Sequence, residues 1–193
     1  MRSWDALPTK RLEPSGEAST QFLSLGIADY RDAARFVNQL PYGRNADRAN
    51  FMLVIPERRG TCSTKHALLA ALAIEQPLPV HLTLGIYEMG EGNTPGVGAV
   101  LDRHRLAFVP EAHCYLTFDG TRIDVTRAAV SPAESVARFL HEEIIAPAQI
   151  GDYKVAMHQT FMRDWVARTM PHRDWREVWK IREECIAALS EPR

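Results

Sequence analysis

The sequence has few cysteines, and they are not arranged to hold a scaffold together. Only three occur in 193 residues, at positions 62, 114 and 185, and no two of them form a Cys-x-x-Cys pair. An odd and sparse set of this kind excludes a disulfide framework. Each thiol is therefore interpreted separately, as a reactive group or as part of the core.

Other features are missing as well. No apolar run approaches the roughly 18 residues that a membrane span needs. The first 20 residues lack the apolar stretch of a signal peptide. The 23 Lys and Arg balance the 24 Asp and Glu without a basic block, which argues against nucleic acid as a partner. The sequence thus predicts a cytoplasmic protein with no membrane partner, no nucleic-acid partner and no cofactor.

The length and the hydrophobic content of 46% suit one domain with a proper core. Residues 1–20 are polar and contain two prolines, so we expect an irregular N-terminal arm. A single domain is expected over 21–193. Its last part, 132–190, is predicted to be helical in two or three pieces, with breaks near Pro147 and Pro171.

The middle of the chain mixes helical and strand patterns. Residues 28–40 have apolar positions at helical spacing, and 63–76 are rich in Ala and Leu on nearly all sides, which predicts a buried central helix. We expect a short buried strand or an extended approach at 51–55, a strand at 80–89, and a hairpin within 108–126. This order predicts an α+β fold in which an antiparallel sheet packs on the central helix.

The hairpin has a strong turn signal at Asp119-Gly120. A two-residue turn at this point fixes the register of the two strands. It pairs Phe118 with Thr121, Leu116 with Ile123, and Cys114 with Val125. Because side chains alternate along a strand, one face of the hairpin is apolar, and it holds Cys114, Leu116, Phe118, Ile123 and Val125.

The other face of the hairpin is polar and holds His113, Tyr115 and Asp124. His113 and Asp124 are diagonal neighbours on adjacent strands, with Cα atoms roughly 7–8 Å apart. A carboxylate at this distance can accept a hydrogen bond from one imidazole nitrogen and leave the other to act as a base. The same alternation directs Cys114 into the core. The alternative is a solvated His–Asp pair on the surface.

The third candidate is Cys62, which is expected in the first turn of the central helix. Gly60 permits a close approach of the chain, and Thr61 or Ser63 can cap the helix. The N–H groups and positive dipole of a helix start stabilise a thiolate, and a nearby histidine can lower a thiol pKa from about 8.5 to roughly 3.5–7.5. The same N–H groups can bind an oxyanion. The alternative is a buried structural thiol.

The stretches GTCSTKHALLAALA and AHCYLTFDGTRIDVT, within about 50–127, resemble the transglutaminase-like superfamily of papain-like thiol enzymes. The resemblance implies a transglutaminase-like core, with Cys62 as nucleophile, His113 as base and Asp124 orienting the histidine. Ser63 stands where the family often has a bulky residue. No clear upstream side chain supplies an oxyanion donor. Tentative substrate or oxyanion contacts are Asn50, Thr61 and Tyr115, with Asn45 a weaker candidate.

Several residues have competing interpretations. His66 follows Cys62 by four residues on the same helical face, so it is either the base, a contact behind the site, or a helix histidine with a local hydrogen bond. With Cys62, His113 and Asp124 it could also bind zinc, but the spacing matches no common zinc motif, so no metal is predicted. The glycine-rich stretch 92–98 is either a lid or an ordinary connection.

The combination favours a cysteine-dependent enzyme that acts on an amide or ester bond through a thioester at Cys62. Release of the acyl group to water would make it a peptidase or amidase, and release to an amine a transglutaminase. The expected substrate is a peptide or a small amide or ester. The rival hypothesis is a non-catalytic binding or scaffold protein that keeps the fold.

Overall fold

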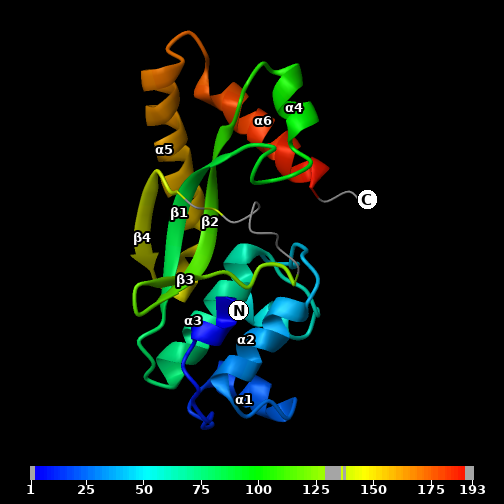
Figure 1. Cartoon of the computed structure of the whole chain (residues 1–193), viewed down its shortest axis with the longest axis vertical. Coiled ribbons are helices and arrows are strands. Elements are labelled where there is room, and N and C mark those ends of the chain that lie inside the picture. The colour runs from blue at the N-terminus through cyan, green and yellow to red at the C-terminus, as the bar shows by residue number, and fades with distance from the viewer. Residues whose placement is uncertain (1–2, 129–135, 137, 190–193) are drawn as a thin grey trace. The chain divides into compact units, whose positions relative to one another are not determined.

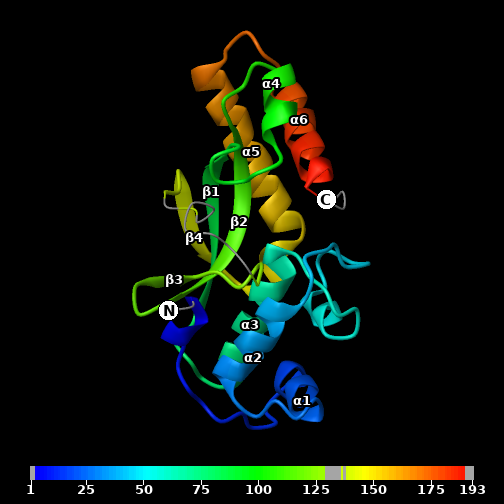
Figure 2. The ribbon, with the colours of Figure 1, turned by 45° about the vertical axis from the view of Figure 1, so that its right-hand side comes forward.

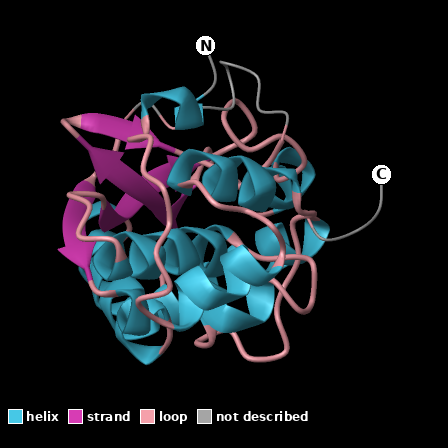
Figure 3. Ribbon diagram, turned by 90° about the horizontal axis from the view of Figure 1, so that it is seen from below, coloured by secondary structure: helices cyan, strands magenta, loops and turns pink. Residues whose placement is uncertain are grey.

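The structure is a computed structural model that describes residues 3–128, 136 and 138–189. Helices and strands both occur along these residues (Figure 1, Figure 3). The α-helices are α1 (Glu17–Ser24), α2 (Tyr30–Gln39), α3 (Cys62–Glu75), α4 (Gly98–Arg103), α5 (Asp152–Thr169) and α6 (Trp175–Ala188). The 3-10 helices are η1 (Ser3–Ala6), η2 (Phe51–Val54) and η4 (Pro147–Ile150).

Four strands form one sheet in the order β3-β2-β1-β4. They are β1 (His81–Met89), β2 (Val109–Phe118), β3 (Thr121–Ile123) and β4 (His141–Ile145). The sheet is antiparallel, so the expected α+β class is confirmed at this coarse level. Among the described residues, no helix has both the length and the apolar character needed to cross a membrane.

The described residues group into two compact units. Unit 1 takes those of Met1–Leu84, His113–Ala129 and Glu143–Asp152. Unit 2 takes those of Gly85–Ala112, Val130–Glu142 and Tyr153–Arg193. Strands β1 and β2 therefore each contribute residues to both units. The candidate residues Cys62, His113 and Asp124 all belong to unit 1.

Helix α3 is the centre of unit 1. It packs against α1, α2, η2 and η4, and Figures 1 and 2 both show it beside α2. Its start is capped by Thr61, one of the two residues expected to do so. The side chains of Leu68, Leu69 and Leu72 are fully buried. Most of α3 is enclosed in this way, which explains why its sequence is apolar on nearly all sides.

The hairpin has the predicted register over the three residue pairs of its ladder, which do not include the predicted Cys114–Val125 pair. Thr121 pairs with Phe118 and Ile123 pairs with Leu116. Asp119 and Gly120 adopt φ values of 47° and 70°, as a type I′ turn requires at both central positions. The last strand is short, however, because β3 ends at Ile123. Asp124 therefore lies just beyond the strand, and contacts other than β-ladder hydrogen bonds must hold it in place.

Cys114 is fully buried, as the alternation along the hairpin predicted. We expect Cys114→Ala to lower the free energy of unfolding by about 1 kcal/mol, because it removes one heavy atom from a packed site. The chemistry of Cys62 should not change. Urea denaturation measures the stability, and alkylation of Cys62 measures the chemistry. Loss of Cys62 reactivity without any change in stability would contradict the register.

Two expectations about local structure need correction. The stretch 51–55 is not a strand, since Phe51–Val54 form the 3-10 helix η2 after a hydrogen bond from the Met52 N–H to the Asn50 side chain. Residues 132–190 are not helical throughout, because β4 occupies His141–Ile145. Part of that range, 132–135, 137 and 190, lies outside the described residues. Helices α5 and α6 do follow as predicted.

The N-terminal segment is more ordered than expected. Of residues 1–20, Ser3–Ala6 form η1 and α1 begins at Glu17. Element η1 packs against α2 and β3. Trp4, Leu7 and Leu12 are buried. These apolar side chains are scattered in a polar stretch, so no helical or strand period reveals them, yet burying them fixes the segment.

Unit 2 has its own apolar core. It gathers residues of β1, α4, β2, α5 and α6, and Trp165, Trp175 and Trp179 pack against it partly buried. Cys185 is fully buried within this core, so its side chain packs there rather than facing solvent. The prediction of one domain over 21–193 stays a prediction.

Candidate active site

Cys62 is the first residue of α3 and is partly exposed. The turn before it is held by Thr61 and Thr64, whose side chains and backbone amides bond reciprocally across the helix start. The Cys62 sulfur lies 3.9 Å from the Ser63 hydroxyl oxygen. Gly60 is needed here because an added Cβ would lie 2.9 Å from the Lys65 Cγ. The sequence thus folds so that the thiol lies at the positive end of a buried helix.

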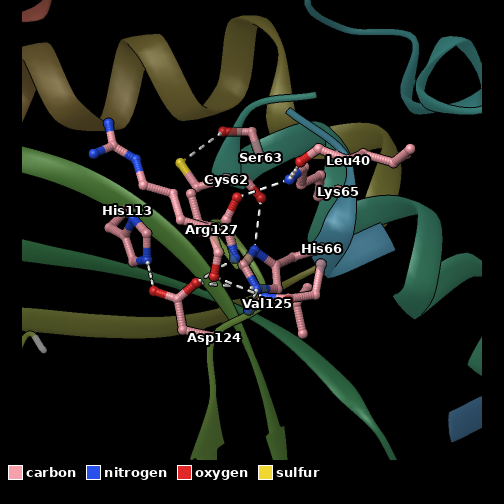
Figure 4. A network of polar contacts seen from close by, with 11 residues as sticks. Leu40, Cys62, Ser63, Lys65, His66, His113, Asp124, Val125 and Arg127 are labelled. Carbon is pink, nitrogen blue, oxygen red and sulfur yellow. Dashed lines mark hydrogen bonds and ion pairs between the residues drawn. The ribbon is translucent and has the colours of Figure 1, made fainter. Parts of the chain in front are cut away.

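His113 and Asp124 form the predicted pair. The Nε2 atom of His113 lies 2.7 Å from the Oδ2 atom of Asp124. The second carboxylate oxygen accepts a hydrogen bond of 2.8 Å from the Thr126 N–H. In Figure 4 the His113 ring lies between the Cys62 side chain and the Asp124 carboxylate. Since Nε2 is taken by Asp124, Nδ1 is the ring nitrogen left for Cys62.

Electrostatic interactions within the site shift the pKa values of His113 and Asp124 in opposite directions. Burial alone would lower the pKa of His113, but the Asp124 carboxylate and the Cys62 thiolate, each with a hydrogen bond to the ring, raise that pKa well above its usual value. Burial alone would raise the pKa of Asp124, but the charge and hydrogen bond of His113 hold it far below its usual value. The site therefore favours a charged imidazolium on His113 beside an ionised Asp124.

The tentative contact residues have structural roles. Tyr115 is buried, and its ring stacks on that of His113 with centroids 6.3 Å apart and planes at 19°. Thr61 caps α3, and Asn50 is exposed and caps η2. The amide nitrogen of Asn45 donates to a Glu57 carboxylate oxygen at 2.9 Å and to the Arg59 carbonyl at 3.0 Å. A substrate or oxyanion role for Asn50, Thr61 or Tyr115 stays a prediction.

Two further residues adjoin the site, and the full burial of their side chains was not predicted from the sequence. Lys65 is fully buried, and its ammonium group donates to the carbonyls of Leu40 at 2.6 Å and Thr126 at 2.7 Å. Burial lowers the pKa of Lys65 to about 8. His66 is also fully buried. One signal of this burial was present in the sequence. Lys65 lies within a helix that is apolar on nearly all sides, and such a helix offers a charged side chain little solvent-exposed surface.

Burial lowers the pKa of His66 to about 4, against an ordinary value near 6.5. Between these values the unfolded chain binds a proton that the folded protein does not, so stability falls as the pH falls from about 6.5 to 4. We expect this group to remove about 3 kcal/mol across that window. His66→Gln should lose that part of the pH dependence. Urea denaturation of both proteins at several pH values measures it, and parallel curves would contradict the prediction.

No group of three or more His, Cys, Asp or Glu within the described part of the chain is arranged to hold a metal ion. The zinc alternative for Cys62, His66, His113 and Asp124 therefore gains no support. No protein-family model, curated protein or solved structure matches this chain.

Proposed function

We propose that the chain is a cysteine-dependent acyl-transfer enzyme with Cys62 as nucleophile, His113 as general base and acid, and Asp124 orienting His113. The observation that carries the proposal is the His113–Asp124 hydrogen bond of 2.7 Å, next to a thiol at the start of a buried helix. A nucleophile, a base and an orienting carboxylate in this order are the parts that acyl transfer needs.

The reaction follows from these positions. The Cys62 thiolate attacks the carbonyl carbon of an amide or ester, and the carbonyl electrons move to the oxygen. The first turn of α3 offers N–H groups and a positive dipole for this oxyanion. When the oxyanion collapses, the bond to the leaving group breaks, the imidazolium of His113 gives that group its proton, and a thioester remains.

The second half restores the enzyme. His113 removes a proton from water or an amine, which attacks the thioester carbonyl. The C–S bond then breaks and leaves the acyl product, the Cys62 thiolate and the His113 imidazolium. Water as acceptor gives a peptidase or amidase, and an amine gives a transglutaminase. We further propose a transglutaminase-like core and a peptide or a small amide or ester as substrate.

A simple activated ester tests the proposal. p-Nitrophenyl acetate should give a burst of nitrophenol and an acetyl adduct on the peptide that contains Cys62. Cys62→Ala should abolish both, and Cys114→Ala should retain both because that thiol is buried. Peptide mapping by mass spectrometry after an acid quench locates the adduct, since a thioester survives at low pH.

An acetyl group spread over all three cysteines, or none on Cys62, would contradict the proposal. In that case the second candidate, a binding or scaffold protein that retains the fold, would replace it. The specific observation behind this candidate is that the Asn45 amide nitrogen already donates to Glu57 and to the Arg59 carbonyl. Asn45 then does not act as a side-chain oxyanion donor without rearrangement, whereas the η2 cap uses the amide oxygen of Asn50.

A further inference from the structure

Both ring nitrogens of His66 are committed to the backbone. Its Nδ1 atom lies 2.7 Å from the carbonyl oxygen of Cys62, and its Nε2 atom lies 2.8 Å from the amide nitrogen of Val125. A carbonyl only accepts and an amide N–H only donates. His66 must therefore be neutral with its proton on Nδ1, and it cannot also serve as the base for Cys62.

These two bonds join the two halves of the candidate site. The Nδ1 bond is to Cys62, which bears the thiol, and the Nε2 bond is to Val125, which follows Asp124 in the chain (Figure 4). This matters because β3 ends at Ile123, so no β-ladder fixes Asp124. Lys65 makes a parallel link, since its ammonium group donates to the Thr126 carbonyl at 2.7 Å.

The neutral state of His66 preserves the hydrogen bond to Val125 and the pairing of Asp124 with His113. The Nε2 atom lies 3.6 Å from the Oδ1 atom of Asp124. A proton on Nε2 would remove the acceptor for the Val125 N–H and would offer Asp124 a second cation in competition with His113. The charged groups that act on His66 are Asp124, which favours that proton, and His113 and Lys65, which oppose it.

We propose that His66 is a positioning residue, which uses its two backbone hydrogen bonds to fix Asp124, and through it His113, relative to Cys62. The inference rests on the proposed acyl transfer for its effect on catalysis. The clamp between α3 and the segment after β3 is a property of the fold, and it can be measured separately. His66 would not touch the substrate, so its loss should act on the reacting geometry rather than on substrate binding.

The test compares three variants. His66→Leu removes both hydrogen bonds, while the amide oxygen of His66→Gln can still accept from Val125. His158→Leu is the matched control, because His158 is a buried histidine of unit 2 whose Nε2 atom also binds a carbonyl, that of Pro110, at 2.9 Å. It reports what losing a buried histidine does to stability alone.

We expect His66→Leu to lower kcat for p-nitrophenyl acetate by about 100-fold with little change in KM, since a small misplacement of reacting groups has an effect of this size. His66→Gln should recover part of the loss, and His158→Leu should leave kcat unchanged. Equal losses in His66→Leu and His158→Leu, or an unchanged kcat in His66→Leu, would overturn the proposal.

Hydrogen exchange of the Val125 amide separates this proposal from the proposed function. His66→Leu should speed exchange at Val125, and His66→Gln should slow it again, whether or not the protein transfers acyl groups. If wild type forms no thioester but Val125 loses protection only in His66→Leu, the acyl-transfer proposal fails and the clamp stands. If Val125 exchanges equally in wild type and His66→Leu, the clamp itself is wrong.

Discussion

His113→Ala is expected to lower kcat/KM for p-nitrophenyl acetate by about 1,000-fold, within the range for loss of a general acid and base. The variant loses the group that stabilises the thiolate and that later deprotonates the acceptor. Asp124→Asn should also lower the rate, because it removes the charge that stabilises the imidazolium and disturbs the orientation of the ring. Steady-state rates at pH 7, with folding checked by circular dichroism, measure both effects.

The matched control for His113→Ala is His104→Ala. His104 pairs with Glu184 at 3.1 Å, so it is also a histidine with a carboxylate partner, but it belongs to unit 2. This variant should retain the wild-type rate. A His113→Ala protein that folds and keeps its rate would show that the base is another group.

The second large effect concerns stability. Arg182→Met is expected to lower the free energy of unfolding by about 3–5 kcal/mol, because it leaves the buried carboxylate of Glu111 without its partner. The Arg182 guanidinium binds both carboxylate oxygens of Glu111, and both side chains are largely buried. Burial alone would raise the pKa of Glu111, but the Arg182 charge and hydrogen bonds lower it overall. Urea denaturation measures the loss.

The double variant Glu111→Leu/Arg182→Met serves as the control. Replacing both partners with apolar groups removes the unpaired charge, so most of the lost stability should return. If the double variant is no more stable than Arg182→Met, the loss does not come from the unpaired carboxylate.

The parts of the site that depend on local rules could be predicted from the sequence. Asp119-Gly120 fixed the hairpin register, and that register placed His113 beside Asp124 and Cys114 in the core. The capped start of α3 placed Cys62 in the first helical turn. Each of these follows from side-chain periodicity or turn chemistry within about 15 residues, which is the range over which a sequence pattern is informative.

The parts of the site that depend on contacts between residues far apart in the chain could not be predicted from the sequence. Lys65 binds the carbonyls of Leu40 and Thr126, which are 25 and 61 residues away in the chain, and no local pattern indicates such partners. The strand at His141–Ile145 has the sequence HEEII, three polar residues followed by two apolar ones, so its sequence lacks the alternation that marks a half-buried strand. Pairing within the sheet, rather than its own sequence, makes it a strand.

The central claim is that Cys62 and His113 form a thiolate–imidazolium pair. Iodoacetamide labelling across a pH series, followed by peptide mapping, tests it most directly. Cys62 should be labelled at neutral pH well before Cys114 and Cys185, both of which are buried, and burial raises the pKa of Cys185 to about 11. After unfolding, all three should react equally. His113→Ala should slow the labelling of Cys62. If Cys62 reacts no faster than a free thiol, both in the wild type and in His113→Ala, the two residues do not form a thiolate–imidazolium pair.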